Sequence, residues 1–221
     1  MLKKHNEVLK NKLMGLIITP LAFVLAGYLL IYLAFGSTID SFVGIWNMVT
    51  ADYKVNEEKD LMTNRLDGYT DSVPSSIITF PIYGDKYAEL TIDSADISAP
   101  VYYGDGNEQL RKGVAQYIGT MYVGSGSTVM ISGHNNTFFH NLGQVQIGDR
   151  VVLRTNYGEY TYEVENTKIT SNTDSSAYDL EATHENLVLY TCYPFNMLGI
   201  TPQRYFVYCK YVSGPKILYD R

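Results

Sequence analysis

The pattern of hydrophobic residues changes along the chain and divides it into two parts. Leu13–Phe35 is an apolar run without a charged residue, and at about 1.5 Å rise per residue a helix of that length covers the roughly 30 Å hydrocarbon core of a bilayer. Apolar residues then recur at helical spacing between Ile39 and Val49, and residues 51–76 are polar without a clear period. From Ile77 onward the period changes to two, which indicates β-strands. The pattern predicts a helical N-terminal part and a β-rich body.

Turn residues separate the period-two segments, as at Gly84-Asp85, Gly148-Asp149 and Asn156-Tyr157-Gly158. Two other segments, Glu108–Tyr117 and Thr137–Val145, are expected to be short helical connections. Many short strands at this spacing predict a mainly all-β fold, an eight-stranded barrel. The expected strands are Ile77–Tyr83, Tyr87–Asp93, Ala99–Tyr103, Thr128–Gly133, Arg150–Thr155, Glu159–Thr170, Leu187–Cys192 and Arg204–Val212.

The N-terminal run is predicted to be a retained transmembrane anchor. A cleaved signal peptide has an apolar region of about 7–15 residues, and this run is longer and lacks an Ala-x-Ala-like exit. Lysines precede it, so the positive-inside rule predicts a single-pass protein of the cell membrane with a cytoplasmic N-terminus and an extracellular body. The segment around Trp46 either lies on the membrane surface or packs on the protein. The expected parts are a basic tail (1–12), the anchor (13–35), a juxtamembrane helix and linker (36–76), the β-rich main domain (77–212) and a C-terminal tail (213–221).

Charge narrows the class of partner. The formal net charge is −6, and because the first twelve residues are basic, the rest of the chain is more acidic still. A phosphate backbone is bound mainly through Lys and Arg, so nucleic acid is not an expected partner. A hydrophobic content of 46% is ample for a packed core, and the 20 tyrosines favour strands.

Three residues that can carry chemistry stand at expected strand ends. His134 closes "TVMISGH", Cys192 closes "LVLYTC", and Arg204 opens "RYFVYCKYV". Side chains at a barrel rim are held by the strands yet reach solvent, as catalytic groups must. Taken singly, each has a structural alternative: a small buried thiol, a hydrogen-bonded imidazole and a surface guanidinium.

The second cysteine, Cys209, serves as an internal control. It lies inside the last expected strand. If the last two strands form an antiparallel hairpin with Cys192 near Arg204, then Cys209 faces residue 187, and the two sulfur atoms are about 15 Å apart. That separation is too large for a disulfide, so both thiols are expected to be free.

Chain order and local sequence exclude several families of cysteine enzymes. Papain-like enzymes place the cysteine before the histidine, whereas here His134 precedes Cys192. Caspases share the order, but "YTCYPF" lacks their local signature. Pro194 has no N–H with which to stabilise an oxyanion, which leaves Arg204 as the obvious cation for that role.

Three segments carry a resemblance to a known family. "SGHNNTFF", "LYTCYPF" and "TPQRYFVY" resemble the signature segments of sortases, the Gram-positive cysteine transpeptidases, whose His, Cys and Arg correspond to His134, Cys192 and Arg204. "VYYGDGNEQLRKGVAQY" and "TCYPFNMLG" are most similar to class D members. The chain departs from the family pattern at Val188, where Thr is frequent, and at Asn135 and Asn136, where class D members often carry Arg-Asp.

The resemblance implies a reaction and its partners. The enzyme would cleave a sorting signal similar to Leu-Pro-x-Thr-Gly between Thr and Gly, with Cys192 forming a thioacyl intermediate. His134, as imidazolium, would protonate the departing amine, and Arg204 would hold the substrate backbone and the oxyanion. The implied partners are secreted proteins with such signals, a peptidoglycan precursor amine that accepts the acyl group, and membrane lipid.

Other expectations are less specific. Thr191, Tyr193 and Pro194 are candidates for substrate binding. Some sortases bind calcium through acidic residues in a loop, but "NTDSSAYDLEATHENL" contains no recognisable calcium motif, so neither a metal site nor a required cofactor is expected. Two alternatives remain: a pilin-polymerising sortase, which joins protein to protein, and a non-catalytic, membrane-tethered β-barrel binding module.

Overall fold

The computed structural model describes residues 15–31, 59–195, 197 and 201–219. Contacts divide the chain into two compact units, residues 1–50 and residues 51–221. In the first unit, residues 15–31 form an α-helix whose side chains are almost all exposed. No helix in the described ranges combines the length and hydropathy expected of a membrane span. The remainder of the predicted anchor and the segment around Trp46 lie outside the described residues.

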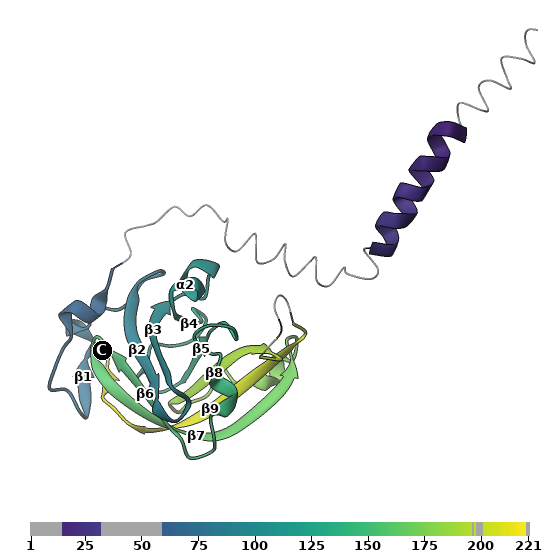
Figure 1. Cartoon of the computed structure of the whole chain (residues 1–221). Coiled ribbons are helices and arrows are strands. Elements are labelled where there is room, and N and C mark those ends of the chain that lie inside the picture. Colours follow the sequence, from purple (N-terminus) through teal and green to yellow (C-terminus); the bar gives the residue numbers. More distant parts are fainter. Residues whose placement is uncertain (1–14, 32–58, 196, 198–200, 220–221) are drawn as a thin grey trace, which may run out of the picture. The chain divides into compact units, whose positions relative to one another are not determined.

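The second unit contains a closed eight-stranded barrel, as the sequence predicts (Figure 1). Its strands are joined in the order β2-β3-β4-β5-β8-β9-β7-β6, and β6 pairs with β2 to close it. The pairs β3–β4 and β5–β8 are parallel and the others are antiparallel. The bounds are β2 Lys86–Ile92, β3 Ile97–Tyr103, β4 Val114–Gln116, β5 Thr128–Ser132, β6 Arg150–Thr155, β7 Gly158–Ser171, β8 Asn186–Tyr193 and β9 Gln203–Ser213.

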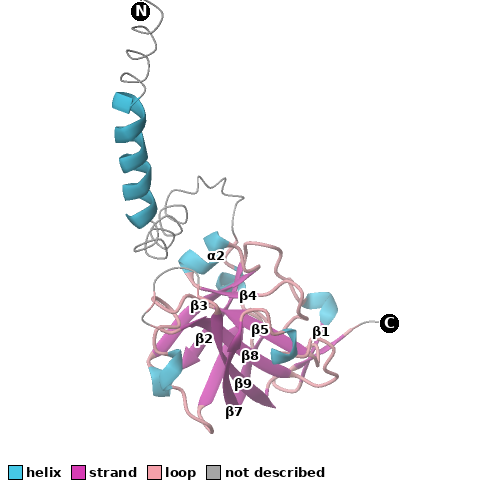
Figure 2. Cartoon of the chain, turned by 90° about the vertical axis from the view of Figure 1, so that its right-hand side faces the viewer, coloured by secondary structure: helices cyan, strands magenta, loops and turns pink. Residues whose placement is uncertain are grey.

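Short helices lie around the strands (Figure 2). The α-helix α2 spans Asn107–Lys112 and carries the chain from β3 to its parallel neighbour β4. The 3₁₀ turns are η1 Leu61–Asn64, η2 Ser75–Ile77, η3 Asp93–Ala95, η4 Leu142–Gln144 and η5 Ser175–Ala177.

One expected strand does not form, and the helix expected at Glu108–Tyr117 is confirmed only in its first half, by α2. No strand forms at Ile77–Tyr83, where Pro81 lacks a ladder donor and where Ile77 and Ile82 are exposed. The eighth barrel strand is instead β4, which lies at the end of the segment expected to be helical. Its residues are all buried, so no alternation of apolar and polar positions reveals it.

Strand alternation assigns the side chains of β8 to two surfaces. Leu187 and Leu189 belong to the main core inside the barrel. Val188 and Tyr190 belong to a second apolar cluster on the outer face of the sheet, together with Phe206 of β9. This division of β8 into inner and outer positions orients the residues at its end.

The chain segments that precede and follow the barrel strands are held by backbone hydrogen bonds. Strand β1 (Ser72–Pro74) pairs in parallel with β10 (Lys216–Leu218). Lys59 donates its backbone N–H to Asp85 over 3.2 Å and accepts a 3.0 Å backbone bond from Lys86. The polar stretch predicted as a linker is therefore bonded to the barrel from Lys59 onward.

Candidate active site

The ends of three adjacent strands bring the candidate residues into one row. In the antiparallel pair β8–β9, Cys192 lies directly opposite Arg204. In the parallel pair β5–β8, Ser132 lies opposite Tyr190, so the same register carried two residues further places His134 opposite Cys192. Neighbouring strands are about 4.8 Å apart, so the three backbones follow one another across the sheet at that spacing.

The thiol does not point into the barrel. Cys192 shares its parity along β8 with Tyr190, on the outer face, and Arg204 lies on the same face because directly paired residues do. Both side chains are partly exposed. The antiparallel hairpin that was the premise for placing Cys209 is the one that forms.

Cys209 shows the opposite environment. It pairs with Leu187, as the hairpin register predicts, and its side chain is 1% exposed within the main core. Burial raises the pKa of the Cys209 thiol far above its ordinary value. Both cysteines are free thiols. Of the two, Cys192 alone is accessible for chemistry.

The His134 imidazole is largely shielded from solvent. Its backbone oxygen accepts a 3.1 Å bond from Phe139, which turns the chain back over the strand end. A side chain on the preceding Gly133 would have its Cβ 2.7 Å from the Phe139 ring, so a glycine permits this close packing. Nε2 of His134 is buried and finds no hydrogen-bond partner among the residues that the structure describes. Desolvation lowers the pKa of His134, which favours a neutral ring at neutral pH.

Arg204 is anchored on one side. Its Nη1 donates to the backbone oxygens of Thr201, at 2.8 Å, and of Gln203, at 2.9 Å. The hydroxyl of Thr201 in turn donates to the oxygen of Gln203 at 3.2 Å. These bonds fix one nitrogen of the fork, and within the described part of the chain Nε and Nη2 make no bond of this kind.

Two side chains link the strand ends that carry the candidate residues. Thr191, expected to bind substrate, is 2% exposed, and its hydroxyl donates to Gly133 O at 2.6 Å. Asn135 was not predicted as a site residue, yet its Nδ2 donates to Pro194 O at 2.9 Å and to Met197 O at 3.4 Å. Together they connect the segments that follow His134 and Cys192. The asparagine in "GHNN" was the only sequence signal for this link.

Tyr193 and Pro194, the other expected substrate-binding residues, directly follow the thiol. Both are partly exposed. The ring centroid of Tyr193 lies 5.8 Å from that of Phe195 and 6.5 Å from that of Tyr205. This aromatic group borders a cavity of about 460 Å³ beside the strand end.

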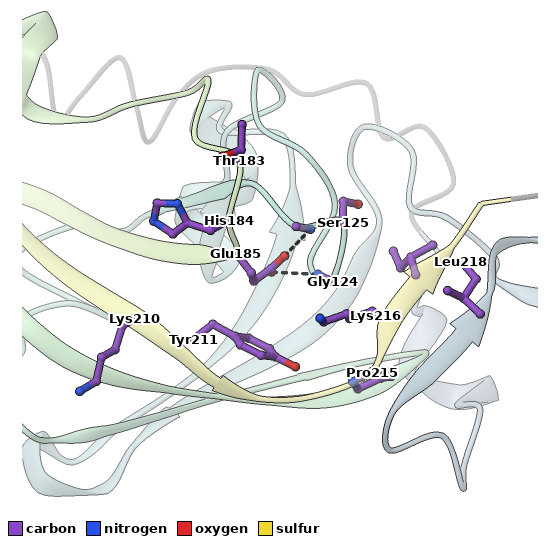
Figure 3. Close-up of a pocket in the computed structure, with 12 residues that line it drawn as sticks. Gly124, Ser125, Thr183, His184, Glu185, Lys210, Tyr211, Pro215, Lys216 and Leu218 are labelled. Carbon is purple, nitrogen blue, oxygen red and sulfur yellow. Dashed lines mark hydrogen bonds between the residues drawn. The ribbon is translucent and has the colours of Figure 1, made fainter.

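A larger cavity, of about 600 Å³, lies at the other end of β5 and β8 (Figure 3). Glu185 lies in its wall and accepts bonds from Gly124 N at 2.9 Å, Gly126 N at 2.7 Å and Tyr162 Oη at 2.9 Å. Burial raises the pKa of Glu185 despite these donors. Because its oxygens are already bonded to the protein, Glu185 joins the strand starts together and is no candidate nucleophile. In the described ranges, no three His, Cys, Asp or Glu side chains gather as a metal site.

Known proteins resemble this chain in sequence and in fold. The family model described as "Sortase domain" matches residues 90–212. Sortase D of Bacillus subtilis is 35% identical over 144 residues, which cover 65% of this chain and 73% of that protein. The catalytic domain of SrtD from B. anthracis is 31% identical with a TM-score of 0.52, covering 63% of this chain and 95% of that one. A Clostridium perfringens sortase D5 transpeptidase shares the fold at 21% identity and a TM-score of 0.54, covering 60% of this chain and 82% of that one.

Proposed function

This chain belongs to the sortase family of cysteine transpeptidases and is class D-like, and from that premise we propose its reaction, site and partners. It cleaves an LPxTG-like sorting signal between Thr and Gly through a thioacyl intermediate. It then transfers the protein to an amine of a cell-wall precursor. The observation that supports the proposal is the direct pairing of Cys192 with Arg204, together with the β5–β8 register, which would place His134 beside Cys192 if it continued past Ser132.

The protonation state of His134 sets the order of events. Because burial lowers its pKa, the resting ring is neutral, and it accepts the thiol proton as sulfur attacks the Thr carbonyl. The resulting imidazolium donates that proton to the departing Gly amine. The thiolate–imidazolium pair is then a transient form rather than the resting one.

Arg204 supplies the charge that the oxyanion needs. Pro194, two residues after the nucleophile, has no N–H and cannot donate to an oxyanion. The bonds to Thr201 and Gln203 hold one side of the guanidinium, and its other nitrogens are directed to the oxyanion and the substrate backbone.

The outer face beside Cys192 supports a peptide substrate. Tyr190 and Phe206 stack with ring centroids 5.6 Å apart, directly behind the Cys192–Arg204 pair. Tyr178, from the β7–β8 connection, lies 6.5 Å from Phe206 and walls this surface. The partly exposed rings of Tyr178 and Tyr190, packed on the buried Phe206, suit the apolar and proline residues of a sorting signal.

The cellular setting extends the proposal. The apolar run 13–35 anchors the enzyme in a lipid membrane, with the lysine-rich tail in the cytoplasm and the barrel outside a Gram-positive cell. In that setting, secreted proteins and peptidoglycan precursors both reach the enzyme.

A single incubation tests the reaction. The full chain in detergent is mixed with a peptide library varied around Leu-Pro-x-Thr-x, with glycylglycine amide, a lysine peptide or no amine. Mass spectrometry is expected to show an acyl adduct on Cys192 and a Thr–Gly amide product. Preference for the lysine peptide would instead indicate a protein-joining enzyme. Absence of any adduct with every peptide would contradict the proposal.

A further inference from the structure

The connection between β7 and β8, residues 172–185, passes over the outer face of the sheet. Ala177 of this connection is buried in the outer apolar cluster, where it joins Val188 of β8 and Phe206 of β9. The next residue, Tyr178, is partly exposed, and its ring centroid lies 6.5 Å from that of Phe206. Tyr178 therefore stands over the face that carries the Cys192 thiol.

Hydroxyl groups of the barrel hold this connection in place. Three of them donate to its backbone oxygens: Tyr208 Oη to Ala177 O at 2.6 Å, Thr128 Oγ1 to Asp179 O at 2.5 Å, and Ser127 Oγ to Ala182 O at 2.8 Å. The donors come from β9, from β5 and from the residue before β5, so the connection is bonded on both sides of β8. A segment fixed in this way keeps its backbone oxygens satisfied without a ligand.

Of these three donors, Tyr208 is the one bonded next to Tyr178. It has the same parity along β9 as Arg204 and Phe206 and packs against the outer cluster. Its ring stacks on that of Phe206 with centroids 6.1 Å apart, while its hydroxyl bonds the oxygen of Ala177. Burial raises the pKa of Tyr208, so the hydroxyl stays protonated and remains a donor at neutral and mildly basic pH.

We infer that Tyr208 is a positioning residue for the sorting-signal peptide: its hydroxyl fixes Tyr178 over the outer face, so that this wall exists before the peptide binds. The inference rests on the proposed function. Tyr208 acts through Tyr178 and touches no reacting atom. A preformed wall spares the peptide the entropic cost of ordering the connection. Once the bond is lost, only the fraction of chains with the wall in place binds, and the apparent affinity falls by that fraction.

The variant Tyr208→Phe, made in the full chain, tests this role because it removes the hydroxyl and keeps the ring on Phe206. The KM for cleavage of a Leu-Pro-x-Thr-Gly peptide should rise roughly threefold to tenfold, the effect of losing one hydrogen bond. At saturating peptide, kcat should stay at the wild-type value, since Cys192 and Arg204 are untouched. Amide hydrogen exchange in residues 177–180 should become faster.

Tyr211→Phe is the matched control. Tyr211 also belongs to β9, and its hydroxyl donates to the backbone oxygen of Gly214 at 2.5 Å. It lies in the wall of the cavity around Glu185, at the opposite end of β8 from the thiol. The control removes the same kind of bond away from Tyr178 and should leave both KM and kcat unchanged. Thermal unfolding of the two variants verifies that each is folded.

A double-mutant cycle separates positioning from a general structural role. Tyr178→Ala alone should raise the KM, and adding Tyr208→Phe to it should raise the KM no further, because the side chain to be positioned is gone. The same fold-rise with and without Tyr178 would overturn the inference. So would a wild-type KM in Tyr208→Phe or in Tyr178→Ala, or an equal rise in Tyr211→Phe. A wild-type chain that forms no thioacyl adduct on Cys192 would instead overturn the proposed function, and that result requires no variant.

Discussion

Cys192 and Arg204 are directly opposite each other on β8 and β9, with both side chains on the outer face of the barrel. A cross-strand pair of this kind brings a nucleophile and a cation together through backbone hydrogen bonding alone, without a mobile loop.

Cys192→Ala should abolish turnover and leave the fold intact, because the side chain lies at the partly exposed strand end. Cys209→Ala is the matched control. It should retain turnover and lose about 1 kcal/mol of stability, since it removes a buried core atom. Peptide cleavage and thermal unfolding of both variants check this. Substantial activity in Cys192→Ala would remove it as the nucleophile.

Arg204→Lys should lower kcat roughly 10²-fold, because an ammonium cannot bond Thr201 and Gln203 and still present a planar fork to the oxyanion. Arg154→Lys, at a partly exposed position of β6 where the side chain pairs with Glu159, makes the same exchange elsewhere and should have no effect on kcat. Steady-state kinetics compare the two. Wild-type rates for Arg204→Lys would reduce Arg204 to a structural role.

The lowered pKa of His134 predicts a pH dependence of stability. In the unfolded chain the imidazole takes up a proton below its ordinary pKa of about 6.5, whereas the folded ring remains neutral to lower pH. Stability from this group is therefore present above about pH 6.5 and is lost progressively as the pH falls.

Urea unfolding across this range should show a smaller loss in His134→Gln than in the wild-type chain. The exposed His184 provides the control, and His184→Gln should keep the wild-type slope. An NMR titration of His134 with a midpoint at or above the ordinary value would contradict the prediction.

Asn135→Asp should impair the site more than Asn135→Ala. The aspartate would direct an oxygen, in place of the Nδ2 donor, at the carbonyls of Pro194 and Met197. We expect Asn135→Asp to lower the free energy of unfolding by about 1–3 kcal/mol and to slow thioacyl formation. Asn136→Asp, on the exposed neighbouring residue, should change neither quantity. Equal behaviour of the two aspartate variants would show that Asn135 does not position the Cys192 segment.

Sequence reasoning reached the parts of the structure that depend on local pattern. Strand β6 was predicted with its observed bounds because Arg150–Thr155 alternates and is bounded by turn residues. The hairpin register paired Cys192 with Arg204 and Cys209 with residue 187. Each result requires only neighbouring strands and a known side-chain period.

The rest of the candidate site depends on contacts between segments that are far apart in the sequence. The position of His134 opposite Cys192 follows from the parallel pairing of β5 with β8, which no local pattern encodes. The bonds of Asn135 and the grouping of Tyr193 with Tyr205 likewise arise only after the barrel closes. The assignment of a strand to Ile77–Tyr83 was wrong because apolar content outweighed Pro81.

The pairing of β1 with β10 has a practical consequence. Strand β1, which precedes the barrel strands, and strand β10, which follows them, pair near the cavity around Glu185. The thiol lies at the opposite ends of β5 and β8. Immobilising the enzyme on a bead through a tag after Tyr219 should therefore leave Cys192 facing the bulk solution. An affinity resin prepared in this way should accept large folded proteins as well as peptides.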